Sequence, residues 1–243
     1  MRAATRARRR RREESLYGQE FFNRDAIAVL DAAGIDKAHV VGLSMGGYTA
    51  LMLAAKYPAR VISCVAAGAG SGALKSSRAQ FIAEAKANAA AMDRAGRIDA
   101  HAMGLSPTRV QLQSKDPRGW QAFVDHLSEH AAHAAAKTLR TVQAGRASLY
   151  DMEAELKAVV APTLLLVGDE DEPCLDVNLW LKRLMPVAKL GVLPGTGHAV
   201  NLEEPAQFNA LVEAFLADVE RGSWRPRDPR AKPGALTALA KVD

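Results

Sequence analysis

One pentapeptide, Gly42-Leu43-Ser44-Met45-Gly46, constrains the local fold of this chain more than any other stretch of its sequence. The apolar run AHVVGL leads into it, and an Ala- and Leu-rich segment that ends at Pro58 follows. The run is typical of a strand buried in a parallel sheet, and the segment is typical of a helix. Glycines allow a sharp turn between the two, with the serine hydroxyl exposed above the sheet. The sequence therefore predicts a nucleophile elbow at Ser44; the alternative is a glycine-rich connection that only packs.

Two further segments supply the groups that such a serine needs. A serine hydroxyl is a weak nucleophile at neutral pH, so it requires a general base and a group that orients the base. The segment LLLVGDEDEP ends a predicted strand with acids, of which Asp171 is the preferred orienting group and Asp169 the alternative. His198 lies in a glycine-containing turn, LPGTGHAVNLEEP, after the last predicted strand. The order Ser, Asp, His, and the place of these residues after parallel strands, fit a catalytic triad. The Met45 backbone N–H is the candidate oxyanion donor.

Predicted strands and helices alternate on both sides of a long helical segment. Residues 19–34 have apolar side chains at helical spacing, and the β-α alternation resumes after residue 150. This order predicts an α/β fold with a mostly parallel sheet. We expect a core formed by residues 15–74 and 151–222, and an Ala-rich helical insertion over 75–150. Residues 1–14 and 223–243, rich in Arg or in Arg and Pro, are expected to be disordered tails.

Three motifs, GLSMGG, VGDEDEP and GTGHAVNLEEP, resemble those of the α/β-hydrolase family. The resemblance covers residues 19–220. Within the family, the chain is similar to the branch of small-molecule hydrolases that includes enol-lactonases and carboxylesterases. It implies a helical lid over 75–150, with Ser44 as nucleophile, Asp171 as acid and His198 as base. It further implies hydrolysis of a small carboxylic ester or lactone through an acyl-enzyme, with no metal and no organic cofactor. Dehalogenases and epoxide hydrolases of this fold carry Asp at the elbow, so those chemistries are disfavoured.

The segment before the elbow departs from this pattern. Family members place several strands there, and the loop after one of them, often marked His-Gly, donates a second oxyanion N–H. Only 43 residues precede Ser44, and His-Gly does not occur in the chain. We therefore expect a truncated amino-terminal region that leaves strand 38–43 at a sheet edge prone to self-association. The alternative function is a catalytically impaired protein of this fold that acts only as a binding module.

Charge and cysteine usage restrict the classes of partner. The net charge of +5 comes from the ends, because seven arginines lie within residues 1–12 and six Lys or Arg oppose two Asp within 221–243. The body between these ends is acidic, so a nucleic-acid partner is not expected. A basic-tailed adaptor for acidic partners is a third, weaker interpretation. The longest apolar run is interrupted by Pro162 and too short for a membrane span. Two lone cysteines, Cys64 and Cys174, favour a reducing, cytoplasmic location.

A second motif offers a competing chemistry. His126, Glu129 and His130 match H-x-x-E-H, and His133 lies seven residues after His126. Histidines one helical turn apart can bind zinc together. The pattern still lacks a further acidic ligand in a defined setting, so we interpret it as a polar stripe on a lid helix.

Overall fold

Four parallel strands form the centre of the molecule. The computed structural model describes residues 13–231. Within them the strands lie in the order β1-β2-β3-β4, and each neighbouring pair is parallel. The strands are β1 (Ala38–Leu43), β2 (Val61–Ala67), β3 (Thr163–Gly168) and β4 (Ala188–Leu193). The predicted α/β fold class is confirmed, and β1 lies at one edge of the sheet.

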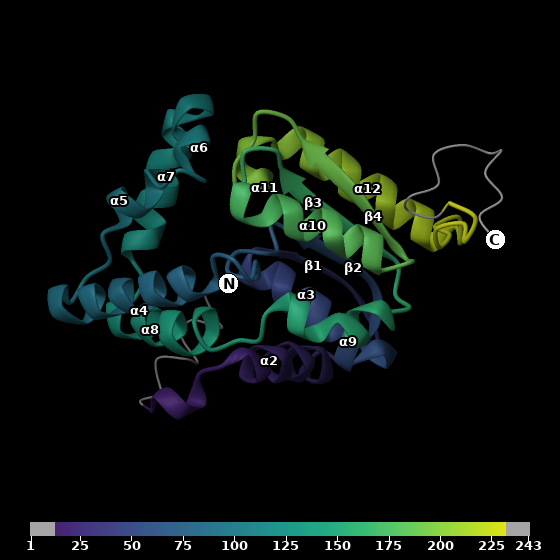
Figure 1. Ribbon diagram of the computed structural model, residues 1–243, viewed down its shortest axis with the longest axis horizontal. Coiled ribbons are helices and arrows are strands. Elements are labelled where there is room, and N and C mark those ends of the chain that lie inside the picture. The colour runs from purple at the N-terminus through teal and green to yellow at the C-terminus, as the bar shows by residue number, and fades with distance from the viewer. Residues whose placement is uncertain (1–12, 232–243) are drawn as a thin grey trace.

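Helices cover both faces of this sheet (Figure 1). On one face Leu51 of α3 and Leu181 of α10 belong to the same buried cluster as Leu165 of β3, and α2 packs outside α3. On the other face Phe215 of α12 packs with Leu166 of β3. The helices are α2 (Gln19–Ala32), α3 (Met45–Lys56), α9 (Glu153–Lys157), α10 (Glu172–Leu184), α11 (Val200–Glu203) and α12 (Pro205–Glu220), with 3-10 turns η1 (Glu14–Leu16) and η2 (Pro58–Arg60). The parallel strands are thus buried between two helical layers, as the apolar strand sequences require.

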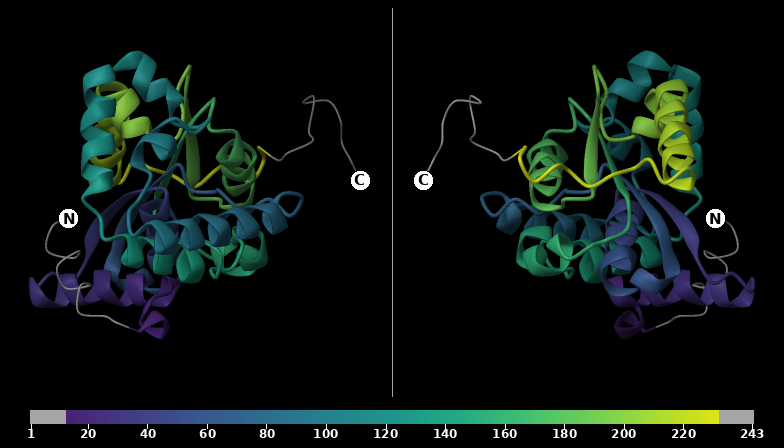
Figure 2. Two further views of the ribbon diagram at one scale, coloured as in Figure 1. Left: turned by 90° about the vertical axis from the view of Figure 1, so that its left-hand side faces the viewer. Right: turned by 90° about the vertical axis from the view of Figure 1, so that its right-hand side faces the viewer.

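A helical insertion separates β2 from β3. It comprises α4 (Arg78–Ala95), α5 (Ala100–Gly104), α6 (Val110–Lys115), α7 (Pro117–Ser128), α8 (Ala132–Thr138), the π-helical turn η3 (Leu139–Gln143) and the 3-10 turn η4 (Leu149–Met152). Leu112, Trp120 and Ala136 belong to a buried cluster of its own. The insertion extends beyond the sheet as an L-shaped arm of α4 and α8 with α5, α6 and α7 (Figures 1 and 2).

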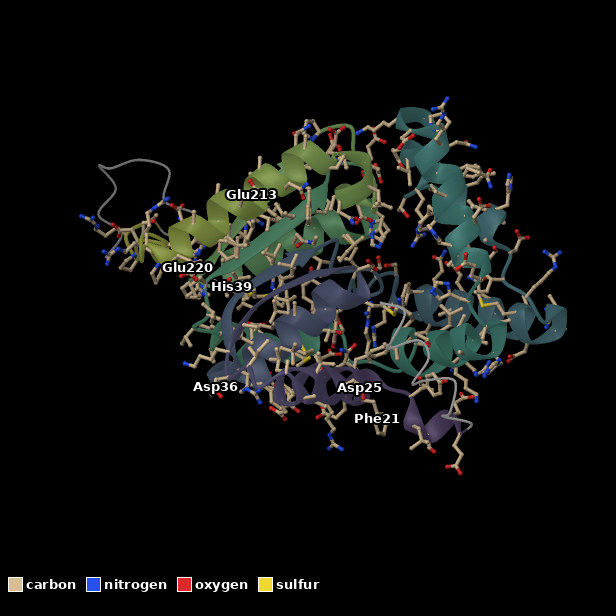
Figure 3. The ribbon with its side chains drawn as sticks, turned by 180° about the vertical axis from the view of Figure 1, so that it is seen from behind. Phe21, Asp25, Asp36, His39, Glu213 and Glu220 are labelled. Carbon is tan, nitrogen blue, oxygen red and sulfur yellow. The ribbon has the colours of Figure 1, made fainter. Side chains whose placement is uncertain are left out.

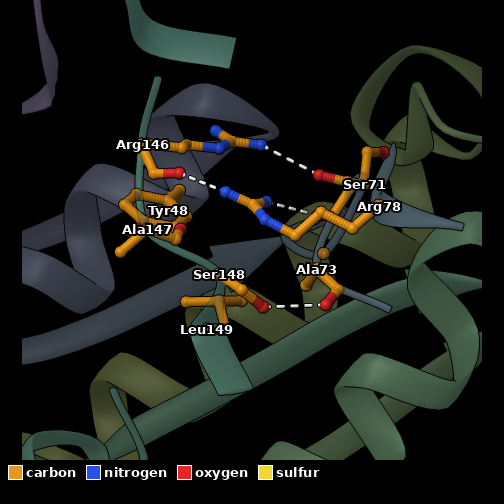
Figure 4. A pocket seen from close by; sticks show the side chains of 10 residues that line it. Tyr48, Ser71, Ala73, Arg78, Arg146, Ala147, Ser148 and Leu149 are labelled. Carbon is orange, nitrogen blue, oxygen red and sulfur yellow. Dashed lines mark hydrogen bonds between the residues drawn. The ribbon is translucent and has the colours of Figure 1, made fainter. Parts of the chain in front are cut away.

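Hydrogen bonds tie together the two ends of the insertion (Figure 4). The Arg146 guanidinium donates to the Ser71 carbonyl oxygen at 3.1 Å, and Arg78 donates to the Arg146 carbonyl oxygen. The Ser148 hydroxyl donates to the Ala73 carbonyl oxygen at 2.7 Å. The segment that leaves the sheet and the one that returns to it are therefore cross-linked at the base of the arm.

Both predicted tails fall partly outside the described residues, and the parts inside are bound to the body. The Glu14 carboxylate pairs with Arg140 at 2.9 Å. Trp224 packs edge-on against Phe215 with ring centroids 4.6 Å apart, and its indole N–H donates to the Val187 carbonyl oxygen. Residues 13–231 include no helix that is long and apolar enough to span a bilayer.

Candidate active site

Ser44 occupies the turn between β1 and α3 in a backbone conformation that L-residues rarely adopt. Its φ of 56° is the only positive φ of a non-glycine residue among the described residues. Its N–H donates to the Ala67 carbonyl oxygen of β2 at 2.8 Å. A Cβ on Gly42 would lie 2.2 Å from the Gly46 backbone, and one on Gly47 would lie 2.7 Å from the Ala67 oxygen. The glycines thus let strand and helix approach closely, and the strain falls on Ser44.

The three residues predicted as a triad lie within hydrogen-bond distance of one another. His198 Nε2 is 2.8 Å from Ser44 Oγ, and His198 Nδ1 is 2.8 Å from Asp171 Oδ2. Asp171 is fully buried and His198 is 6% exposed. These side chains come from turns after β1, β3 and β4, at the carboxyl edge of the sheet where parallel strands converge. The arrangement allows the imidazole to accept the serine proton while the carboxylate holds the opposite ring nitrogen.

Asp169, the alternative acid, has another set of partners. Its Oδ1 accepts the Thr196 backbone N–H at 3.0 Å. That bond is the main cause that lowers the pKa of Asp169 below its ordinary value. Asp169 therefore stabilises the turn that precedes His198, whereas Asp171 contacts the imidazole itself.

Two groups that the sequence analysis did not single out hold the His198 loop. The buried Glu203 carboxylate accepts the N–H groups of Gly197 at 2.6 Å and of Ala199 at 2.9 Å. Burial raises the pKa of Glu203, although the two amides oppose that shift. The N–H of His198 itself donates to the Thr108 carbonyl oxygen in the insertion at 2.7 Å. Glu203 lies in the quoted motif GTGHAVNLEEP, but nothing local indicates that its side chain turns back towards the histidine.

Cys174 adds a thiol beside the acid. A carboxylate oxygen of Asp171, the Cys174 sulfur and a ring nitrogen of His198 lie within 4.8 Å of one another, the kind of ligand set that can hold a metal ion. Burial, and then the Asp171 charge, raise the pKa of the Cys174 thiol. Asp171 Oδ1 is buried without a hydrogen-bond partner among the described residues. Because His198 Nδ1 and Asp171 Oδ2 are already bonded to each other, a metal here would compete with the bond that orients the imidazole.

Met45, the candidate oxyanion donor, is the first residue of α3. Backbone amides in the first turn of a helix have no intrahelical acceptor, so the Met45 N–H is available to an anion. β1 is the first strand of the described residues. The expected second donor, a backbone N–H in a loop after an earlier strand, is therefore not among the described residues.

The H-x-x-E-H motif does not form a two-histidine face. α7 ends at Ser128, so His130 lies beyond the helix that carries His126, and His130 Nδ1 contacts the His126 carbonyl oxygen at 2.9 Å. Among residues 13–231, Asp171, Cys174 and His198 form the group with metal-ligand spacing.

Figure 3 shows a further histidine, His39, beside Glu220. It lies within β1, inside the strand expected over 38–43, and joins this strand to β2 and α12. Its ring nitrogens are 2.7 Å from Ser63 Oγ and 2.7 Å from Glu220 Oε1.

Comparison with known proteins places the geometry in a family. Residues 1–205 match the family model described as alpha/beta hydrolase fold. The chain is 31% identical over 206 residues to a 2-hydroxymuconate semialdehyde hydrolase of Pseudomonas putida, with 84% of this chain and 71% of that protein covered. It is 30% identical over 200 residues to a 2-hydroxy-6-oxononadienedioate/2-hydroxy-6-oxononatrienedioate hydrolase of Burkholderia vietnamiensis, with 77% of this chain and 65% of that protein covered.

Solved structures share the fold at lower sequence identity. MenH from S. aureus superposes with a TM-score of 0.75 at 21% identity, covering 84% of this chain and 76% of that chain. The enol-lactonase from Burkholderia xenovorans superposes with a TM-score of 0.68 at 20% identity, covering 83% and 74%. The motifs, the strand order and these matches agree, and the chain belongs to the alpha/beta hydrolase fold family.

Proposed function

We propose that this protein is a serine hydrolase that cleaves a small carboxylic ester or lactone through an acyl-enzyme intermediate. The observation that carries the proposal is the continuous pair of hydrogen bonds from Ser44 Oγ through His198 to Asp171, each 2.8 Å long. The fold family, whose members among the relatives are hydrolases, supports the same reaction class.

In the proposed mechanism His198 moves a proton twice. Nε2 takes the proton of Ser44 as its oxygen attacks the substrate carbonyl, and the protonated ring then gives that proton to the departing alkoxide. A water molecule attacks the acyl-enzyme, with His198 again as the base. Asp171 holds Nδ1 and stabilises the imidazolium, and the Met45 N–H donates to the oxyanion.

A chemical test distinguishes this function from that of a binding module without turnover. The wild type is expected to hydrolyse 4-nitrophenyl butyrate, and Ser44→Ala is expected to lower kcat by about four to six orders of magnitude. Ser128→Ala, which removes an exposed hydroxyl of α7, is the matched control and should retain activity. A fluorophosphonate should label Ser44 in the wild type.

The alternative is a binding module that retains the elbow without effective turnover. The favouring observation is that residues 13–231 offer Met45 as a candidate oxyanion donor and contain no strand before β1 whose loop could supply the expected second donor, because loss of one donor costs about 10²- to 10³-fold in turnover. No hydrolysis, together with no phosphonate labelling of a folded wild type, would support this alternative. We also propose a cytoplasmic location, supported by the two unpaired thiols of Cys64 and Cys174.

A further inference from the structure

The carboxylate of Asp171 has one oxygen that the catalytic hydrogen bonds do not use. Oδ2 is 2.8 Å from His198 Nδ1, whereas Oδ1 is buried without a hydrogen-bond partner among residues 13–231. Cys174, in the first turn of α10, brings a thiol to the same place. Its sulfur, a carboxylate oxygen of Asp171 and a ring nitrogen of His198 lie within 4.8 Å of one another, and all three side chains are buried. A buried polar atom without a partner is costly, so this cluster has unused capacity for a ligand.

The three side chains offer the donor types that zinc prefers. Zinc binds thiolate sulfur, imidazole nitrogen and carboxylate oxygen with tetrahedral geometry at about 2.0–2.3 Å, which spaces the ligand atoms roughly 3.5 Å apart. Shifts of the side chains by about 1 Å would therefore bring all three atoms onto one ion, with water in the fourth position. The Ser71 hydroxyl is 3.2 Å from Cys174 Sγ and can donate to the thiolate, a contact that would orient this ligand.

The charge of this donor set suits a divalent ion that binds sulfur. Coordination requires the thiolate, so the Cys174 thiol releases its proton to solvent when the metal binds. One thiolate and one carboxylate then balance the two positive charges of the ion, which matters because an uncompensated buried charge is unfavourable. Mg²⁺ and Ca²⁺ prefer ligand sets made of oxygen alone, so this set favours Zn²⁺ over both.

We propose that Asp171, Cys174 and His198 Nδ1 form an inhibitory Zn²⁺ site, in which the ion replaces the hydrogen bond between Asp171 and the imidazole. A metal on Nδ1 uses the lone pair of that nitrogen, so the single proton of the neutral ring shifts to Nε2. Nε2 faces Ser44 Oγ at 2.8 Å, and once protonated it cannot accept the serine proton. Inhibition rests on the proposed hydrolase function, whereas binding of the ion does not.

Metal binding by the full chain tests the site without turnover. After equilibrium dialysis against ZnCl₂, elemental analysis should find one more zinc ion per chain in the wild type than in Cys174→Ser, which keeps a hydroxyl but supplies no thiolate. Cys64→Ala, which removes the other buried thiol, is the matched control and should retain this ion. With Co²⁺ in place of Zn²⁺, a thiolate-to-cobalt charge-transfer band should appear in the wild type and in Cys64→Ala alone. Equal zinc content and equal cobalt spectra in the wild type and Cys174→Ser would overturn the inference.

Inhibition of 4-nitrophenyl butyrate hydrolysis provides the second readout, with each variant compared with its own rate in EDTA. ZnCl₂ should inhibit the wild type and Cys64→Ala alike, and MgCl₂ should inhibit neither. In Cys174→Ser the Zn²⁺ concentration for half inhibition should rise at least about 100-fold, because loss of even an outer partner of a metal ligand costs about 10- to 100-fold in affinity. Equal sensitivity of the wild type and Cys174→Ser would mean that zinc acts elsewhere, and would refute the site.

The inference and the proposed function fail in different ways. A wild type that hydrolyses the ester and takes up no zinc at Cys174 refutes the metal site alone. Absent hydrolysis and absent phosphonate labelling of Ser44 refute the hydrolase function, and the dialysis comparison still decides whether zinc binds. Cys174→Ala, which adds no polar group to the core, repeats each comparison if circular dichroism shows that Cys174→Ser does not fold.

Discussion

At the scale of single residues, the elbow concentrates steric demands on a few positions. Ser44 has a positive φ, a conformation that costs on the order of 1–3 kcal/mol and persists only where its surroundings enforce it. Gly42 allows the backbone of α3 to lie against β1, whereas a Cβ on Gly46 would meet no atom within 4 Å. The two glycines of the same motif therefore have different structural roles.

This difference predicts opposite effects of two alanine substitutions. Gly42→Ala should destabilise the fold by at least about 1–3 kcal/mol, because its Cβ would overlap the Gly46 backbone. Gly46→Ala, within α3, should be neutral or stabilise by roughly 0.5–1 kcal/mol. Thermal unfolding of the two variants, followed by circular dichroism, checks this ranking. Equal losses of stability in both would contradict the role assigned to Gly42.

The depressed pKa of Asp169 predicts a pH dependence of stability. Because the folded-state pKa lies below the ordinary value of 3.8, the ionised carboxylate stabilises the fold above that value. The contribution is lost as the pH falls through the folded-state pKa. Asp169→Asn should therefore have a lower melting temperature than the wild type at neutral pH, and the two melting temperatures should converge in strong acid. Asp36→Asn removes an exposed carboxylate elsewhere, and its difference in melting temperature from the wild type should not depend on pH in this way.

At the scale of elements, α6 of the insertion is fastened to the loop that carries His198. Lys115 at the end of α6 pairs with Glu204 and donates to the Thr196 hydroxyl at 3.2 Å. Gln111 of the same helix donates to Glu170 at 2.7 Å. The position of the candidate base thus depends on contacts with the insertion as well as with the sheet.

Loss of the Lys115 contacts should loosen this loop without unfolding the protein. We expect Lys115→Met to lower kcat about 2- to 5-fold, the size expected from a half-exposed ion pair of about 0.5–1 kcal/mol. Hydrogen exchange should accelerate in α6 and in residues 194–199. Lys86→Met, an exposed change on α4, is the control. Unchanged exchange in both segments would argue against coupling through α6.

At the scale of the whole molecule, β1 is an edge strand of the sheet that residues 13–231 form. The strand pairs with β2 on one side alone among the described residues, and Val41 in it is 48% exposed. An apolar edge strand of this kind can pair with another chain. We propose that two copies associate through β1.

Charge at this edge should prevent the association. The wild type is expected to show a concentration-dependent increase in mass by analytical ultracentrifugation, and Val41→Lys is expected to remain monomeric. Val160→Lys, at a position 72% exposed and outside every strand, tests whether any added lysine has this effect. A wild type that stays monomeric at all concentrations would refute association through β1.

Local patterns in the sequence were sufficient for the alternation of strands and helices, the insertion and the turn at Ser44. Such patterns depend on residues a few positions apart, whose spacing sets which face is buried and where the backbone can turn. They also identified Ser44 and His198 and limited the acid to Asp171, the preferred residue, or Asp169. The structure brings Ser44, His198 and Asp171 within hydrogen-bond distance, and their catalytic roles are our proposal.

Contacts between distant segments decided the rest. Asp169 and Asp171 have similar local surroundings in VGDEDEP. Only the path of the loop that carries Thr196 and His198, 27 positions later, brings Asp171 to the imidazole and Asp169 to a backbone amide. The return of Glu203 towards its own loop and the contact of Thr108 with His198 likewise have no local signature. Hydrogen bonds act over about 3 Å, so their partners are set by how the chain closes in three dimensions and not by its linear order.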